Sequence, residues 1–257
     1  MKTTTITAIC LLLTMNLFAQ SHFVRSGIVE YEKSVNMYTL IGKNIGNNSN
    51  DIFGPKAFEQ YKKNQPQFKI LKSTLTFSNN KTLFVPIVDD GVAMGGMFNI
   101  PQAQQNSIVY TDVTTRSTIS QRKMFDENFL VKDSVVKIKW KITDETREIA
   151  GYTCRRANAL ILDSVYVVAF FTDQITVDGG PEIFTGLPGM ILQIALPHEN
   201  MSWIATKVTD TTVPATAVIP PKKGKVVTDK ELRETIMSVY SKKWNGWERL
   251  IYKMLML

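Results

Sequence analysis

The feature that most constrains the fold is a long succession of short segments rich in β-branched and aromatic residues, separated from one another by polar turn residues. Such segments occupy residues 28–31, 69–77, 82–85, 108–119, 121–125, 129–132, 136–142, 154–162, 165–172, 190–196 and 202–208. Short strands at this spacing are typical of an antiparallel sheet, either open or rolled into a barrel. The sequence therefore predicts a mainly β fold: an antiparallel meander that forms an open half-barrel, with a C-terminal helix.

Local patterns add detail to this meander. Asn79-Asn80 separates two of the strands, and asparagine tolerates the positive φ that a tight hairpin turn requires. Residues 136–142 alternate four apolar side chains with three lysines, which predicts a half-buried strand with a solvated lysine row. Residues 38–50 are rich in glycine and asparagine and predict a loop. Pro55 suits a first helical turn and predicts a short helix over residues 55–63.

The C-terminal part of the chain predicts a connector and a helix. Residues 211–225 contain three prolines and are expected to be extended. Thr228 and Glu231 have the spacing of a capping box, and Leu232 and Ile236 share one face of the helix that should follow. We therefore expect three regions: a signal peptide over 1–20, an antiparallel β domain over 21–225, and a C-terminal helix over 226–257 whose apolar tail packs on that domain.

The N-terminal segment has the order of a secretory signal peptide: a basic start at Lys2, an apolar core over residues 6–18, and a small residue at Ala19. The alternative is an N-terminal core strand or helix. The residues before Cys10 do not form a lipobox, so no lipoprotein is predicted. The apolar core is shorter than a membrane span, and we expect no transmembrane span after its removal. The predicted location is the periplasm or the outer membrane of a diderm bacterium.

Composition narrows the range of partners. With 44% apolar and 21% charged residues, the chain is too apolar and too weakly charged to be disordered. The formal net charge is +7, but the lysines are spread out and no run of five basic residues occurs. A nucleic-acid partner would require a concentrated basic stripe, so none is predicted. An apolar ligand or an envelope protein remains as the expected partner.

Few residues could carry catalysis. His22 and His198 are the only histidines, and there is no Gly-x-Ser-x-Gly elbow to support a nucleophile. No Cys-x-x-Cys, His-x-His or His-Glu-x-x-His spacing points to a metal, and no phosphate loop or dinucleotide motif occurs. We therefore expect a non-enzymatic protein without a cofactor. A hydrolase would need His198 in a cleft beside a hydroxyl or thiol.

Cys154 supports an alternative function. Removal of residues 1–20 would leave it as the sole cysteine, so it cannot form an intramolecular disulfide. A free cysteine is commonly a small buried hydrophobe. Thioethers and thiolates also suit soft copper, and Cys154 with His198, Met94 and Met97 would form a soft-metal or redox site. Packing of loop methionines in an apolar core is the competing interpretation of Met94 and Met97.

Residues 179–192 form an unusual segment, called here the motif segment. It combines four glycines and two prolines with apolar residues, and it contains Gly186-Leu187-Pro188-Gly189-Met190-Ile191. Gly186 and Gly189 flank Leu187-Pro188 as a turn with positive φ would require. An apolar loop that runs into a strand is expected to close one end of the half-barrel. If it were exposed, it would be a docking surface instead.

Residues 186–191 resemble the signature of the GLPGLI family of exported bacterial proteins, with Met190 in place of the usual leucine. Gly180-Pro181 and Phe184 are similar to the lead-in of that signature, and residues 148–157 are similar to the stretch in which the family places its cysteine. The resemblance extends over about residues 25–210. It implies export, but no activity, because the family is named after its motif and its function is largely unassigned.

These observations favour an exported, non-enzymatic binding or accessory protein of the cell envelope. Its sheet would hold an apolar ligand or a partner segment, and residues 186–191 would close one end. The succession of strands also resembles the open half-barrels of periplasmic lipoprotein carriers, a likeness of fold alone. The soft-metal or redox protein based on Cys154 is the alternative.

Overall fold

The computed structural model describes residues 23–46, 54–87, 100–124, 127–162 and 164–241. The predicted signal peptide, Met94, Met97 and the apolar C-terminal tail therefore lie outside the described residues. The strands are β1 (Ser26–Asn36), β2 (Phe68–Ser78), β3 (Lys81–Ile87), β4 (Ser107–Asp112), β5 (Ser117–Met124), β6 (Glu127–Ser134), β7 (Lys141–Ile149), β8 (Tyr152–Ile161), β9 (Val165–Thr172), β10 (Met190–Leu196), β11 (Met201–Asp210) and β12 (Lys225–Val227).

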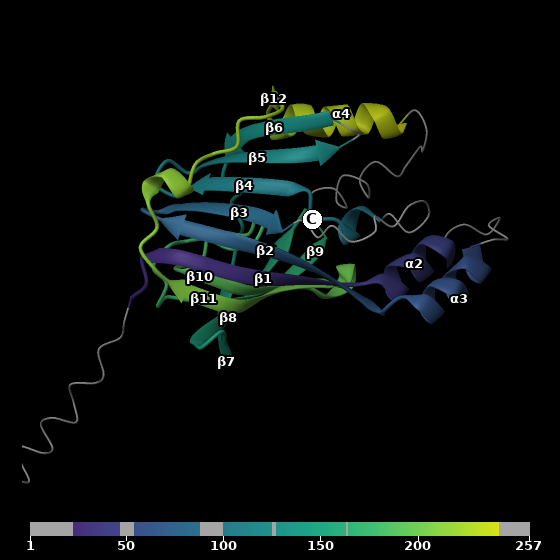
Figure 1. Ribbon diagram of the computed structural model, residues 1–257, viewed down its shortest axis with the longest axis horizontal. Coiled ribbons are helices and arrows are strands. Elements are labelled where there is room, and N and C mark those ends of the chain that lie inside the picture. Colours follow the sequence, from purple (N-terminus) through teal and green to yellow (C-terminus); the bar gives the residue numbers. More distant parts are fainter. Residues whose placement is uncertain (1–22, 47–53, 88–99, 125–126, 163, 242–257) are drawn as a thin grey trace, which may run out of the picture.

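These described strands form one curled sheet in the order β12-β6-β5-β4-β3-β2-β1-β11-β10-β9-β8-β7 (Figure 1). Strands β1 to β6 are one meander and β7 to β11 are another, and the pairing of β1 with β11 joins the two. The neighbours pair antiparallel, apart from the parallel pair of β12 with β6. The sheet stays open, because β12 and β7 lie at its two edges. The predicted fold class, an open antiparallel meander with a C-terminal helix, is confirmed.

Alternation along the strands decides which side chains face the interior. In β1 every second residue is buried, from Val29 through Tyr31 and Lys33 to Val35. The β2–β3 hairpin turns at Asn79 and Asn80, whose φ values of 51° and 59° confirm the predicted turn. Positive φ at both central residues gives a twist that matches the strands on either side.

The prediction of a loop over residues 38–50 was wrong for its first part, because Met37–Gly46 forms helix α2. The Oδ1 atom of Asn36 accepts a hydrogen bond from the backbone N–H of Thr39 at 3.1 Å and caps this helix. Leu40 and Ile41 are buried in the main core. Burial of an apolar face thus outweighs the low helix propensity of the glycines and asparagine.

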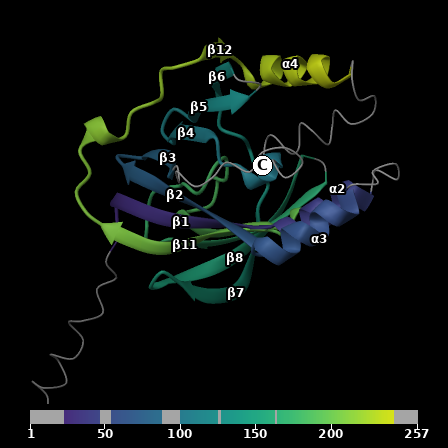
Figure 2. The ribbon, with the colours of Figure 1, turned by 45° about the vertical axis from the view of Figure 1, so that its right-hand side comes forward.

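Helix α2 packs against helix α3 (Gly54–Asn64), which confirms the short helix predicted over residues 55–63. The ring of Tyr38 makes edge-on contacts with Phe58 and Tyr61, at centroid distances of 6.3 Å and 6.2 Å. Figure 2 shows the two helices side by side at one end of the sheet. Short 3-10 helices lie at η3 (Pro101–Ala103), η4 (Pro197–Glu199) and η5 (Ala215–Ala217).

The strand predicted over residues 136–142 was also wrong. Residues 135–140, called here the crossing segment, have no strand pairing, and β7 begins only at Lys141. Strand β6 lies near one edge of the sheet and β7 forms the other edge, so the chain between them crosses the concave side. Ile138 and Trp140 pack against the core from there, and the lysines are exposed as expected. Apolar residues and lysines do alternate in this stretch of the sequence, but residues 135–140 pair with no strand of the described chain.

Helix α4 (Asp229–Ser241) covers the β6 edge of the sheet (Figure 1). The predicted capping box is confirmed: the Glu231 carboxylate accepts the backbone N–H of Thr228 at 2.7 Å, and the Thr228 hydroxyl accepts the N–H of Glu231 at 3.2 Å. Leu232 and Ile236 are fully buried in a small cluster with residues of β6 and β12. Among the described residues, no helix is long and apolar enough to cross a membrane.

Candidate functional site

The motif segment is held in a strained backbone conformation. Gly186 and Gly189 have φ values of 93° and 131°, and Glu182, a non-glycine residue, has a φ of 54°. At Gly189 the chain passes so close to β9 that an added Cβ would lie 2.1 Å from the carbonyl oxygen of Thr172. Only glycine fits this position, because it combines positive φ with the space of a hydrogen atom. Strain of this kind is concentrated at functional sites in proteins.

Apolar side chains of the motif segment anchor it in the interior. Phe184, Leu187 and Ile191 belong to the main core, and Met190 belongs to a second cluster, whereas Gly186 and Pro188 are exposed. The segment is therefore mostly buried. Its exposed part is too small to form an apolar docking surface.

Three hydrogen bonds with side chains help to hold the backbone of the motif segment in place. The Thr185 carbonyl accepts the indole N–H of Trp140 at 2.8 Å, and the N–H of Gly186 donates to the Asp178 carboxylate at 2.7 Å. The Tyr31 hydroxyl donates to the carbonyl of Ile191 at 2.6 Å. The segment thus spans the concave side of the sheet and is tied to β1 and to the crossing segment.

A charged cluster lies beside the motif segment and consists of Lys33, Arg122 and Glu182. Lys33 on β1 is 1% exposed and Arg122 on β5 is 6% exposed. Burying charged groups is costly unless they are paired, so such residues are rare in a core. The cluster combines three separate parts of the chain on the concave face. These are the side chains that we consider functional candidates.

The Lys33 ammonium is the most deeply buried charge of this cluster. Its Nζ donates to the carbonyl of Gln104 at 3.3 Å and lies 4.6 Å from the centroid of the Trp203 ring. Burial lowers the pKa of Lys33 from 10.5 to about 8, with a smaller opposite effect from the Glu182 carboxylate. A substantial fraction of this amine is thus neutral at slightly alkaline pH.

Glu182 shares the same polar interior. The residue as a whole is half-buried, but burial of its carboxyl raises the pKa, while the charges of Lys33 and Arg122 act in the opposite direction. Nearby, the Oε1 atoms of Gln102 and Gln105 and the Nε1 atom of Trp203 are buried without a hydrogen-bond partner in the described part of the chain. Such polar atoms lower stability, so stability alone does not account for this polar interior.

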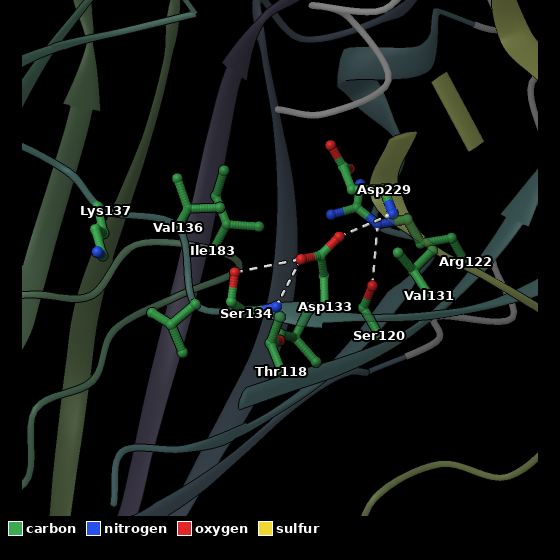
Figure 3. A pocket seen from close by; sticks show the side chains of 12 residues that line it. Thr118, Ser120, Arg122, Val131, Asp133, Ser134, Val136, Lys137, Ile183 and Asp229 are labelled. Carbon is green, nitrogen blue, oxygen red and sulfur yellow. Dashed lines mark hydrogen bonds between the residues drawn. The ribbon is translucent and has the colours of Figure 1, made fainter. Parts of the chain in front are cut away.

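A cavity of about 260 Å³ lies beside Arg122, which forms a part of its lining. It lies between strands β5 and β6, the crossing segment, Ile183 of the motif segment, and Asp229 at the start of α4. Figure 3 shows Arg122 beside Ser120 and Asp229, with Val136 and Ile183 next to each other. The apolar part of the lining is Val109, Val131, Val135, Val136 and Ile183. The polar part is Thr118, Ser120, Arg122, Asp133, Ser134, Lys137 and Asp229.

The polar wall of the cavity is held by hydrogen bonds of its own (Figure 3). Asp133 accepts the backbone N–H of Ser134 at 2.7 Å and that of Asp229 at 3.1 Å, and both bonds lower the pKa of its carboxyl. The Nε of Arg122 donates to the Ser120 hydroxyl at 3.3 Å. Asp133 is therefore a fixed anion at neutral pH, and Arg122 is a fixed cation across from it.

Cys154 lies outside this region. Its side chain is fully buried in the second core cluster, and burial raises the pKa of its thiol from 9.0 to about 12. The Sγ donates to the carbonyl of Tyr152 at 3.4 Å. A buried thiol of this kind is poorly suited to act as a nucleophile or as a metal ligand, because both require the thiolate.

The structure does not bring His198 to Cys154. Cys154 packs near Met190 and Leu192, at the start of β10, whereas His198 is exposed in the turn after the end of that strand. Met94 and Met97 lie outside the described residues. Within the described ranges, no group of three His, Cys, Asp or Glu side chains is placed to hold a metal ion.

The sequence contained a signal for the charged cluster that our sequence analysis missed. Lys33 occupies an inward position of β1, in register with Val29, Tyr31 and Val35, and so interrupts an otherwise apolar face. A lysine at such a position is a recognisable exception to the alternating pattern. Arg122 and Glu182 offered no comparable signal, because the folding of distant segments places them beside Lys33.

Comparison with known proteins identifies related folds. The model of a family described as "N-glycanase peptide, N-terminal domain" matches residues 97–231. Two crystal structures of PNGF-II, in space groups C2 and P21, are similar with TM-scores of 0.52 and 0.51 and sequence identities of 14% and 16%. Each similarity covers 82% of this chain, but only 32% and 33% of the PNGF-II chain. The chain thus spans about a third of the length of those proteins. No curated protein matches the sequence.

Proposed function

Because this chain belongs to the family described as "N-glycanase peptide, N-terminal domain", we propose that it is an exported, non-enzymatic accessory protein of the cell envelope that binds glycosylated partners. The family name refers to enzymes that act on N-glycans. The similarity to PNGF-II supports a shared fold, and this chain corresponds to only a third of those proteins. The binding of glycans is therefore the part of their chemistry that we propose for it.

The observation that carries the proposal is the polar concave face next to the motif segment. Arg122, Glu182 and the cavity all lie within residues 97–231, the part that the family model matches. Among the described residues, buried side chains such as Phe184, Leu187 and Trp203 fill the main core, where we expected an apolar ligand. The cavity beside Arg122, which combines apolar and polar lining residues, is our candidate for a binding site.

The proposal of a non-enzymatic role is supported by the chemistry of the site. The Cys154 thiol is buried, its pKa is raised to about 12, and it packs at the opposite end of β10 from His198. The polar part of the cavity lining consists of hydroxyls and charged groups, and a histidine or thiol is not among the described lining residues. Ser120 accepts a hydrogen bond from a guanidinium, which does not activate a hydroxyl as a base would.

Export and membership of the GLPGLI family complete the proposal. Both rest on sequence patterns, the N-terminal segment and residues 186–191. The mature N-terminus in the envelope fraction of the native cells, determined by mass spectrometry, tests export. Cleavage after Ala19 or Gln20 is expected, and a mature protein that still contains Lys2 would refute it.

Binding is tested with an N-glycopeptide and with the same peptide after removal of its glycan. Calorimetric titration of the full chain should detect binding of the glycopeptide and at least tenfold weaker binding of the bare peptide, roughly 1.4 kcal/mol. Mass spectrometry of the incubated glycopeptide should detect neither free glycan nor conversion of its asparagine to aspartate. Equal affinity for both peptides would refute glycan recognition, and released glycan would refute the non-enzymatic role.

A further inference from the structure

The cavity beside Arg122 is lined by β4, β5, β6 and the crossing segment, which follow one another along the chain, and by two residues distant from them, Ile183 of the motif segment and Asp229 of α4. Val136 and Ile183 form an apolar wall, and Ser120 and Arg122 belong to a polar wall in which Val131 lies opposite Ser120 on the neighbouring strand (Figure 3). The motif segment is strained next to Ile183, since Glu182 has a φ of 54°. Backbone strain at Glu182, next to the lining residue Ile183, is a feature that proteins concentrate at functional sites.

The charges of the cavity favour a neutral ligand. Arg122 and Lys137 supply two positive charges, and Asp133 and Asp229 supply two negative ones. The backbone N–H groups of Ser134 and Asp229 lower the pKa of Asp133, so it stays ionised at neutral pH. An anionic ligand would meet this carboxylate and a cationic one would meet Arg122. A ligand with a net charge therefore gains little from the site as a whole.

The hydroxyl groups of the polar wall have complementary roles. The Thr118 hydroxyl donates to the carbonyl of Tyr110 at 3.1 Å, so its oxygen turns lone pairs towards other donors. The Ser120 hydroxyl accepts from Arg122 at 3.3 Å, so its hydrogen points elsewhere. Together with the Asp133 carboxylate and the Arg122 guanidinium, the wall offers donors and acceptors side by side. A polyhydroxyl compound satisfies both, because each hydroxyl donates and accepts.

We propose that this cavity binds one neutral sugar unit of a glycan, with its hydroxyls on Ser120, Arg122 and Asp133 and its C–H face on Val136 and Ile183. This inference rests on the proposed function and names the site and the ligand class for it. The volume of about 260 Å³ is below that of cavities for drug-sized ligands and suits a single ring. A single sugar ring makes only a few contacts in such a cavity, so its affinity should be weak. We expect millimolar dissociation constants.

Methyl mannoside and methyl N-acetylglucosaminide are the probes, with glucuronate and glucosamine as charged counterparts. Saturation-transfer NMR of the full chain should detect binding of at least one neutral glycoside, and weaker binding of both charged sugars. The blocking variant is Val136→Arg, at a lining residue that is 48% exposed and so tolerates a larger side chain. Its matched control is Ile142→Arg, at a residue of β7 that is 39% exposed and outside the lining.

Val136→Arg should abolish glycoside binding, and Ile142→Arg should leave it unchanged. Ser120→Ala, which only removes a hydroxyl, should weaken binding roughly tenfold through the loss of a hydrogen bond. No binding of any neutral glycoside, equal binding by Val136→Arg, or tighter binding of a charged sugar would overturn the inference.

Glycopeptide binding, measured on the same variants, separates this inference from the proposed function. If Val136→Arg binds the glycopeptide as tightly as the unchanged chain, the cavity is refuted as the site but the function remains. If the unchanged chain binds glycosides in a Val136-dependent manner but does not bind the glycopeptide, the cavity stands and the proposed function is refuted.

Discussion

Lys33 and Trp203 face each other across β1 and β11, and the ammonium of Lys33 lies 4.6 Å from the centroid of the Trp203 ring. The indole face attracts the cation and offsets a part of the cost of its burial. The cost of burial that is not offset lowers the pKa of Lys33 from 10.5 to about 8. This pair thus connects the packing of the core to the titration of the charged cluster.

The stability of the protein should depend on pH through Lys33. Its pKa is about 8 in the folded chain and 10.5 in the reference state, so the unfolded chain binds more protons between these values. The contribution of Lys33 to the free energy of unfolding therefore rises with pH from about 8 to about 10.5, by about 3 kcal/mol. In urea denaturation across this range, the difference in stability between the unchanged chain and Lys33→Met should therefore grow with pH by about this amount.

The difference between these two proteins isolates Lys33, because Tyr31 and Cys154 titrate in both. Their pKa values are raised, so they lower the stability at high pH in both proteins alike. A stability difference that does not change between pH 8 and pH 10.5 would contradict the assignment of Lys33.

Gly189→Ala should destabilise the fold by about 3 kcal/mol, since the new Cβ meets the Thr172 carbonyl at a φ of 131°. Gly151→Ala is the matched control. Gly151 also has positive φ, at 83°, but a Cβ there would have no neighbour within 4 Å, so the loss should be about 1 kcal/mol. Equal losses in chemical denaturation would show that the close approach to β9 does not matter.

Cys154 should be unreactive in the native protein. Its thiol is fully buried and its pKa is raised to about 12, so little thiolate forms at pH 8. Alkylation with iodoacetamide, followed by peptide mass spectrometry, should label Cys154 only after denaturation. Rapid native labelling, or loss of Cu(I) binding in Cys154→Ser, would instead support the soft-metal alternative.

Thr228→Ala should lower the stability by about 1 kcal/mol, because it removes the hydroxyl that accepts the N–H of Glu231 at the start of α4. Thr235→Ala is the control on the same helix: its hydroxyl donates to the carbonyl of Glu231 within the helix, and its loss should be nearly neutral. Equal effects of both substitutions on the denaturation midpoint would argue against the capping box.

Helix α2 and the crossing segment show where sequence patterns reach their limit. The Gly- and Asn-rich composition of residues 38–50 pointed to a loop, but contacts of Tyr38 with Phe58 and Tyr61 stabilise a helix over Met37–Gly46. Residues 136–142 alternate like a strand, but residues 136–140 cross the concave side without a strand partner, and only Lys141 and Ile142 pair, at the start of β7. In both cases the deciding partner is distant in sequence, so local pattern cannot reveal it.

The sequence by itself determined the local features: the mainly β class, the hairpin at Asn79-Asn80, the capping box at Thr228, and the turn glycines of the motif segment. These depend on backbone conformations and on periodicities that a few neighbouring residues set. Only the tertiary structure decided that Lys33, Arg122 and Glu182 share one interior, and that a cavity forms beside them. The pairing of β1 with β11 and the crossing at residues 135–140 bring them together, and such contacts depend on how the whole sheet curls.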